Sequence, residues 1–252
     1  MNLAPRNPGK KKAPAQSLRG KVALITGGNR GIGLAIARAL AAEGCDLIIT
    51  GRDQNALKKA GRELAHYKTR VMMATCNVRI PKDVAAVFAS IKKRFPRLDI
   101  LINNAGTAHP NVNIADLPFE AWKQVIETNL TGMFLVTQAA LPLMKSGGII
   151  VNNLSIAAKQ VFAGSSGYNA SKHGALGFTN TLREELREKG IRVIALLPGA
   201  TDTAIWNTLW PDAPRKKMMS AATVAQAVVN ALTLPDDSNL EELTILPAAG
   251  TL

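Results

Sequence analysis

The chain has 252 residues, 47% of them hydrophobic, and it carries 31 lysines and arginines against 18 aspartates and glutamates, a formal net charge of +13. This apolar fraction excludes a wholly disordered chain, and the length fits one large α/β domain or two small ones. The positive charge indicates an anionic partner among nucleic acids, acidic lipids and phosphorylated small molecules. Charge alone does not choose among these.

Cysteine and histidine usage argues against two kinds of site. Cys45 and Cys76 are too few for a disulfide framework, and they form no Cys-x-x-Cys pair for redox chemistry or metal binding. Both lie beside apolar runs, so we expect them to be small buried hydrophobes in a reducing compartment. The histidines, His66, His109 and His173, share no spacing typical of metal ligands, so we expect no metal site.

The N-terminal part of the chain has no apolar signal-peptide core, and no stretch of the sequence approaches the roughly 18 unbroken apolar residues of a membrane span. We therefore expect a cytoplasmic protein without a membrane partner. Residues 1–17 combine prolines with basic residues and lack acids. They predict a flexible basic tail, either a solvated extension or a weak polyanion-binding arm. Residues 18–252 then form a single domain.

From residue 21 onward, strand and helix signals alternate. The short, mostly apolar runs typical of buried parallel strands lie at 22–26, 46–50, 71–75, 99–103, 148–154, 192–197 and 243–247. Helical stretches lie between most of them, at 32–43, 54–66, 82–95, 119–145 and 168–189. Repeated β-α units with right-handed crossovers predict an α/β fold with a doubly wound parallel sheet of about seven strands and helices on both faces.

The first predicted strand runs directly into a glycine-rich turn, TGGNRGIG at 26–33, and an apolar helical stretch follows. Gly27, Gly31 and Gly33 permit a tight turn, close approach of the backbone to a pyrophosphate, and close packing of helix on strand. The helix N-terminus offers free N–H groups and the positive end of its dipole to a phosphate. A turn of this kind between strand and helix predicts dinucleotide binding.

A second motif places Tyr168 and Lys172 four residues apart in a predicted helix, so that both side chains lie on one face. A cationic lysine favours the phenolate and lowers the pKa of the tyrosine, which can then exchange a proton with a substrate oxygen. Such a pair by itself is more typical of a solvated helix face. Ser155, which ends the fifth strand at the ligand-binding edge of the sheet, favours a catalytic pair instead.

Taken together, these motifs resemble the short-chain dehydrogenase/reductase family over residues 18–252. The resemblance rests on Thr26 to Gly33, Asn103 to Gly106 (NNAG), Asn129, Ser155, Tyr168 with Lys172, Pro198-Gly199 and Thr203. It implies a single-domain Rossmann-type fold and an NAD(P)-dependent oxidoreductase. The activity implied is NADPH-dependent reduction of a ketone or aldehyde to an alcohol, or the reverse reaction, by hydride transfer.

The resemblance also implies roles for four catalytic residues. Tyr168 is the general acid in reduction and the base in oxidation, while Ser155 positions the substrate oxygen. Lys172 lowers the pKa of the tyrosine and binds the nicotinamide ribose. Asn129 helps to hold a water in a proton relay behind Lys172; the alternative is a buried amide that satisfies backbone groups in a long helix.

The cofactor-binding residues implied by the resemblance extend along the whole chain. They are Gly27, Asn29, Arg30, Gly31, Ile32, Gly33, Arg52, Asn77, Val78, Asn104, Ala105, Gly106, Tyr168, Lys172, Pro198, Gly199, Thr201 and Thr203. Asn77 stands where the family often has an aspartate near the adenine, and an asparagine can still form that hydrogen bond. Leu154 and Leu197 also depart from the family pattern, but neither position must donate, accept or carry charge.

The end of the second strand bears on the choice between NADP and NAD. A free ribose 2′-hydroxyl requires a carboxylate there, whereas a 2′-phosphate requires a cation. In NAD-preferring relatives the acid falls at the position of Gly51, while Arg30 and Arg52 match the NADP pattern and can grip a phosphate. Asp53 is the contrary residue, and we expect it to cap the next helix. NADP(H) is therefore preferred, with NAD(H) as the alternative.

Substrate choice is expected in loops 107–113, 156–164 and 201–220 at the carboxyl edge of the sheet. The last loop predicts an apolar lid made of Trp206, Trp210, Met218 and Met219. Its Arg215-Lys216-Lys217 run is either a solvated stretch or a contact for an acidic substrate.

Within the family, the alternatives are a 3-oxoacyl-(acyl-carrier-protein) reductase and a small 3-hydroxy acid dehydrogenase. Outside it, they are a basic nucleic-acid-binding protein or a cofactor sensor, although aromatic residues are scarce and no nucleic-acid-binding module is present. Relatives pair the helices matching 119–145 and 168–189 across a dimer axis, which implies a homodimer or homotetramer.

Overall fold

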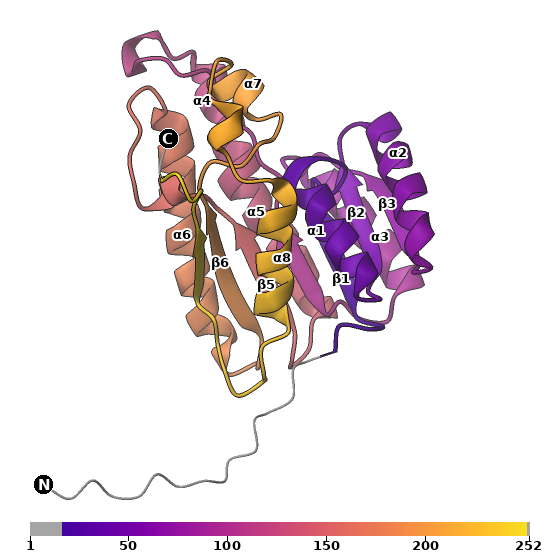
Figure 1. Cartoon of the computed structure of the whole chain (residues 1–252). Coiled ribbons are helices and arrows are strands. Elements are labelled where there is room, and N and C mark those ends of the chain that lie inside the picture. The colour runs from indigo at the N-terminus through magenta and orange to yellow at the C-terminus, as the bar shows by residue number, and fades with distance from the viewer. Residues whose placement is uncertain (1–16, 251–252) are drawn as a thin grey trace, which may run out of the picture.

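The computed structural model describes residues 17–250, so the predicted tail at 1–17 lies outside the described residues apart from Ser17. One sheet contains seven strands, all parallel, in the order β3-β2-β1-β4-β5-β6-β7 (Figure 1). The strands are β1 Val22–Thr26, β2 Asp46–Gly51, β3 Val71–Thr75, β4 Ile100–Asn103, β5 Ile149–Asn153, β6 Arg192–Pro198 and β7 Glu242–Ile245. The predicted doubly wound α/β fold is confirmed.

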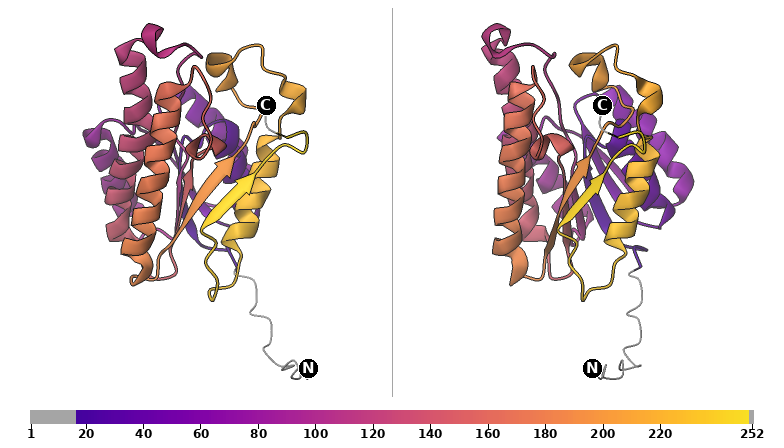
Figure 2. Two further views of the ribbon diagram at one scale, coloured as in Figure 1. Left: turned by 90° about the vertical axis from the view of Figure 1, so that its left-hand side faces the viewer. Right: turned by 60° about the vertical axis from the view of Figure 1, so that its left-hand side comes forward.

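Helices cover both faces of this sheet, and Figure 2 shows the strands between a layer that contains α8 and a layer that contains α5 and α6. The helices are α1 Gly31–Ala42, α2 Gln54–Leu64, α3 Pro81–Arg94, α4 Phe119–Ile126, α5 Gly132–Ala140, α6 Ser166–Arg187, α7 Trp206–Leu209 and α8 Ala221–Leu232. Among residues 17–250, none of them has both the length and the apolar character that a bilayer crossing requires.

The inner strands are mostly apolar because each buries alternate side chains on opposite faces, whereas the edge strands β3 and β7 are partly exposed. In β1, Ala23 and Ile25 join a core with α1, α2 and α8, while Val22 and Leu24 join a second core with α3, α5 and α6. Both cores are closed by helices, so the sheet has no solvated face over its central strands. Cys45 and Cys76 are buried free thiols in these cores, as expected.

Two helical predictions were wrong in detail. The expected helix at 119–145 consists of α4, a π-helical turn at Glu127–Thr131, α5 and a short 3-10 turn. Helix α8 was not predicted, although Ser220 caps it by accepting from Thr223 N (3.1 Å). The segment is rich in alanine and valine, and its apolar face packs against α1 on the sheet.

The strand order reverses between β1 and β4, because the chain leaves β1 toward β2 on one side and returns to β4 on the other. At such a switch point the loops that follow the neighbouring strands separate and leave a crevice at their carboxyl ends. The loops after β1, β2, β4, β5 and β6 all open at this edge. The topology therefore places the glycine-rich turn and Ser155 around one space.

Candidate active site

A cavity of about 990 Å³ occupies this carboxyl edge. It extends from the glycine-rich turn after β1 to α7, and both Ser155 and Tyr168 line it. Of all the site residues predicted from the sequence, only Gly33 and Asn129 do not line it. The structure therefore brings the other predicted site residues, which are spread along the chain from Gly27 to Thr203, around one cavity.

Gly33 lies behind the wall, where it permits close packing of the turn. A Cβ at Gly33 would lie 2.3 Å from Asn104 Nδ2 and 2.4 Å from the Gly27 carbonyl oxygen, so a larger residue would push these groups apart. Asn104 Nδ2 donates to the Thr26 carbonyl (2.8 Å), and Asn104 N donates to Thr26 Oγ1 (2.9 Å). Gly27 itself has a φ of +64°, a backbone region that suits glycine.

The N-terminus of α1 points its first N–H groups at the cavity wall. Arg30 is the N-cap residue and forms no side-chain capping bond, and no acidic residue lies in the first turn. These N–H groups and the helix dipole remain available to an anion. The turn, with its glycines and free donors, fits a pyrophosphate.

The end of β2 fits a phosphate better than a free ribose hydroxyl. Arg30 and Arg52 line the same end of the cavity. A Cβ at Gly51 would lie 2.5 Å from Asn29 Oδ1, so no carboxylate can stand at this position unless Asn29 moves. Asp53 lines the cavity but is held as the cap of α2, because its Oδ1 accepts from Asn55 N (2.8 Å) and Ala56 N (3.0 Å). The expected capping role of Asp53 is confirmed.

Tyr168 and Lys172 face the other end of the cavity from one side of α6, as their spacing predicts. The Lys172 ammonium donates to the Asn153 carbonyl at the end of β5 (3.2 Å) and lies 5.5 Å from the centre of the Tyr168 ring. Ser155, two residues beyond Asn153, accepts from Ala157 N through its Oγ (3.1 Å). Three residues from two elements thus surround one point of the cavity.

Burial dominates the electrostatics of this group. It raises the pKa of the Tyr168 phenol, and a hydrogen bond with Ser155 opposes that change. It also lowers the pKa of Lys172 to about 8. The sequence predicts a lowered pKa for Tyr168, and for the chain alone that direction is wrong. The reason is that Lys172 is buried and Tyr168 is partly buried, and loss of water disfavours the phenolate as well as the ammonium.

Asn129 lies in the π-helical turn between α4 and α5 and is only 1% exposed. Its Oδ1 accepts from Thr107 N and its Nδ2 donates to the Thr107 carbonyl, both at 2.9 Å. The same Nδ2 contacts Ser171 Oγ at 3.0 Å. The amide satisfies backbone groups, as the alternative considered above expects, and the role of Asn129 in a proton relay stays a prediction. This amide ties the loop after β4 to α6 next to Lys172.

His109 is a residue at this site that the sequence did not single out. It is 2% exposed, and its Nε2 accepts from Gly167 N, the residue before Tyr168 (3.1 Å). Its Nδ1 lies 2.7 Å from the Pro110 carbonyl, which requires the neutral tautomer with the proton on Nδ1. The ring joins the loop after β4 to the start of α6, and no local sequence signal predicts that contact.

The expected apolar lid forms only in part. Trp206 and Trp210 line the cavity, with their rings edge to face and their centres 6.5 Å apart. Trp206 Nε1 donates to the Thr201 carbonyl (2.9 Å), which holds the indole in place. Met218 and Met219 do not line the cavity, and Met219 instead packs into the core beneath α8.

Within residues 17–250, no group of three or more histidine, cysteine, aspartate or glutamate side chains lies close enough together to hold a metal ion.

Comparisons with known proteins agree with this geometry. A family model described as "short chain dehydrogenase" matches residues 21–214. A Streptomyces coelicolor protein named "Putative ketoacyl reductase" is 40% identical over 187 residues, which are 73% of this chain and 71% of that protein.

Two solved structures share the fold. An alcohol dehydrogenase from the archaeon Thermococcus sibiricus, complexed with 5-hydroxy-NADP, has a TM-score of 0.85 at 30% identity and covers 91% of this chain and 97% of its own. A variant of actinorhodin polyketide ketoreductase with NADPH has a TM-score of 0.82 at 31% identity and covers 92% of this chain and 98% of its own.

Proposed function

Because the chain belongs to the short-chain dehydrogenase family, we propose that it is an NADP(H)-preferring oxidoreductase that interconverts a ketone or aldehyde and the corresponding alcohol. The observation that carries the proposal is the shared cavity, which Ser155, Tyr168 and Lys172 line together with the glycine-rich turn. A dinucleotide bound along that turn supplies or accepts the hydride when it is present.

The protein's own residues handle the proton. Tyr168 donates its phenolic proton to the carbonyl oxygen as the alcohol forms, and it takes the proton back in the reverse direction. Ser155 hydrogen-bonds the same oxygen and holds it within reach of the phenol. Lys172, when protonated, opposes the effect of burial on Tyr168, because a cation at 5.5 Å from the ring favours the phenolate.

NADP preference rests on the charge at the adenosine end of the cavity. Arg30 and Arg52 both line the cavity, and a guanidinium group can bind a phosphate through two hydrogen bonds. Gly51 carries no acid for a 2′-hydroxyl, and a side chain at that position would require the Asn29 side chain to move. The NADP(H) ligands of the two structural neighbours agree with this assignment.

The chain's two tyrosines provide a matched test of the mechanism. We expect the purified protein to oxidise NADPH in the presence of a suitable ketone or aldehyde from a carbonyl panel, run in parallel with NADH. Tyr168→Phe should abolish this activity, since a phenyl ring carries no proton to transfer. Tyr67→Phe, at an exposed position outside the cavity, should leave the rate unchanged. An unchanged rate in Tyr168→Phe would overturn the mechanism.

We also propose a homodimer or homotetramer, with α4, α5 and α6 at the subunit contact. Two large apolar side chains lie exposed on α4 and α5, Phe119 and Phe134. Phe134 packs edge to face against Phe178 of α6, and their ring centres are 6.3 Å apart. Light scattering coupled to size-exclusion chromatography tests the assembly, and Phe134→Glu should shift it toward the monomer.

A further inference from the structure

The substrate end of the cavity is lined by large apolar side chains and by uncharged polar ones, among them Asn111, Ser165 and Thr208. Its large lining side chains include Ile156, Val161, Phe162, Ile205, Trp206 and Trp210. The charged residues in the lining are Arg30, Arg52 and Asp53, which lie at the adenosine end, and Lys172. Among the described residues that line the cavity, loops 107–113, 156–164 and 201–220 therefore contribute no charge.

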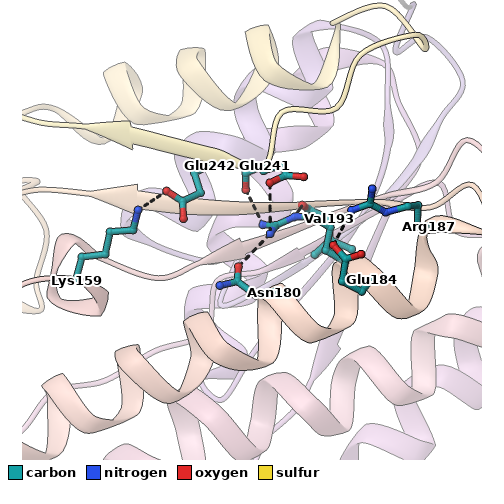
Figure 3. Close-up of polar contacts among 8 residues, drawn as sticks. Lys159, Asn180, Glu184, Arg187, Val193, Glu241 and Glu242 are labelled. Atoms are coloured by element: carbon teal, nitrogen blue, oxygen red, sulfur yellow. Dashed lines mark hydrogen bonds and ion pairs between the residues drawn. The ribbon is translucent and has the colours of Figure 1, made fainter.

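The cation within loop 156–164 is directed away from this space. Lys159 forms an ion pair with Glu242 on β7, and Figure 3 shows its side chain reaching across to that strand. Lys159 does not line the cavity. The pairing neutralises the lysine and fixes the loop to the edge of the sheet.

The basic run of loop 201–220 is also turned to other partners. Arg215 donates through Nη1 to Asp202 Oδ1 and to the Thr203 carbonyl, both at 2.8 Å. Its Nη2 donates to Asn207 Oδ1 at 2.7 Å. Lys216 and Lys217 are exposed and do not line the cavity. Arg215 thus braces the base of the lid and Lys216 and Lys217 are solvated, so the arrangement does not favour a contact between this run and an acidic substrate.

A carboxylate or phosphate that enters this space loses part of its water and meets no cation from loops 107–113, 156–164 and 201–220. Leaving a charge unpaired in an apolar site is strongly unfavourable. Within residues 17–250, Lys172 is the one charged residue of the lining at this end, and it lies on α6 beside Tyr168, where it donates to the Asn153 carbonyl. The two indole rings instead offer a broad apolar surface, fixed by the bond from Trp206 to the Thr201 carbonyl.

From this arrangement, and resting on the proposed function, we propose that the substrate is an uncharged, largely apolar ketone or aldehyde held under Trp206 and Trp210. The site discriminates against carbonyl compounds that carry an anionic group close to the reacting carbon. Of the alternatives within the family, this disfavours a dehydrogenase of small hydroxy acids.

A matched pair of substrates tests the proposal. Methyl 3-oxobutanoate and 3-oxobutanoate share the reacting ketone and differ in the charge of the terminal group. We expect kcat/KM with NADPH to be about 100-fold higher for the ester, a difference of about 3 kcal/mol in transition-state binding. A value for the acid that equals or exceeds that for the ester would overturn the inference while leaving the proposed function intact. A wide carbonyl panel without any turnover would refute both.

Variants of this chain locate the effect. Val161→Arg introduces a cation at a lining position that is 79% exposed, so the fold should tolerate it, and we expect the preference for the ester to fall about tenfold. Lys159→Met removes a cation outside the lining and should leave the preference unchanged. A large change in the preference on Lys159→Met would contradict the proposal, because it would show that this lysine reaches the substrate.

The lid makes a second, independent expectation. Wild-type protein should reduce 4-phenylbutan-2-one more efficiently than butan-2-one, because the phenyl group can pack against the indoles. In Trp210→Ala, the ratio of kcat/KM for 4-phenylbutan-2-one to that for butan-2-one should fall about tenfold. Because Trp210 is 43% exposed, this substitution should not unfold the chain. An advantage that persists undiminished in the variant would place the apolar group elsewhere and refute the role of the lid.

Discussion

Replacing Lys172 with methionine is expected to stabilise the folded protein while removing its activity. Lys172 is 5% exposed, and its side chain keeps an ammonium group inside the cavity wall with one hydrogen bond, to the Asn153 carbonyl. Burial lowers its pKa from 10.5 to about 8. A group whose charged form is disfavoured in the folded state reduces stability wherever that charged form is populated in the unfolded chain.

The size of this effect follows from the pKa difference. Each pKa unit corresponds to about 1.4 kcal/mol, so the buried ammonium costs about 3 kcal/mol of folding free energy. Above the unfolded pKa of 10.5 the lysine is neutral in both states and the cost vanishes. The cost grows as the pH falls from 10.5 toward the folded value of about 8, and it is complete below that. In Lys172→Met, loss of the hydrogen bond to the Asn153 carbonyl reduces the folding stability by about 1 kcal/mol, so the variant gains about 2 kcal/mol of stability in total.

Equilibrium urea unfolding without added nucleotide measures this gain at about pH 7 and about pH 9.5. At the lower pH, Lys172→Met should be more stable by about 2 kcal/mol, or a rise of about 4–8 °C in Tm. At the higher pH the cost of the lysine falls to about 1 kcal/mol, and the two proteins should be equally stable. Lys58→Met, on the exposed surface of α2, is the control and should show no gain that depends on pH.

Two results would refute this reasoning. The first is a Lys172→Met protein that is less stable than wild type at about pH 7, which would mean that the ammonium contributes net stability to the cofactor-free fold. The second is an equal gain at both pH values, which would mean that the gain does not come from titration of the lysine. The second result would place the pKa of Lys172 near its ordinary value.

Three further substitutions test the cavity. Arg52→Ala should raise KM for NADPH by roughly 10–100-fold and leave KM for NADH nearly unchanged in steady-state assays; equal losses would contradict the 2′-phosphate assignment. Gly33→Ala should weaken NADPH binding in fluorescence titrations and destabilise the fold by roughly 1–3 kcal/mol, because its Cβ would lie 2.3 Å from Asn104 Nδ2. Its control is Gly177→Ala, where the Cβ meets nothing within 4 Å; equal binding by both would refute the clash. His109→Phe leaves Gly167 N without its acceptor, so the free energy of unfolding should fall by about 1–3 kcal/mol and kcat should fall as well. An unchanged kcat would show that this contact does not affect catalysis.

Much of the fold could be predicted from local patterns. The seven apolar runs each mark a strand within a few residues, because a strand buried on both faces leaves a continuous apolar signature. Helix α8 was not predicted, although its pattern is present in the sequence. Val224, Val228 and Leu232 recur at helical spacing, and Thr223, Gln226 and Asn230 form the opposite, exposed face. The π-helical turn that holds Asn129, by contrast, has no signal in the sequence, since it depends on the bonds to Thr107 and Ser171.

The sequence by itself determined which chemical groups are present and which of them share a turn or a helix face: the glycines of the first turn, Ser155 at a strand end, and Tyr168 with Lys172. Only the tertiary structure decided their environment. Burial reverses the expected shift of the Tyr168 pKa, and pairing with Glu242 turns Lys159 away from the cavity. These outcomes depend on residues far apart in the chain, because water exclusion and charge pairing are properties of the assembled layers rather than of any local segment.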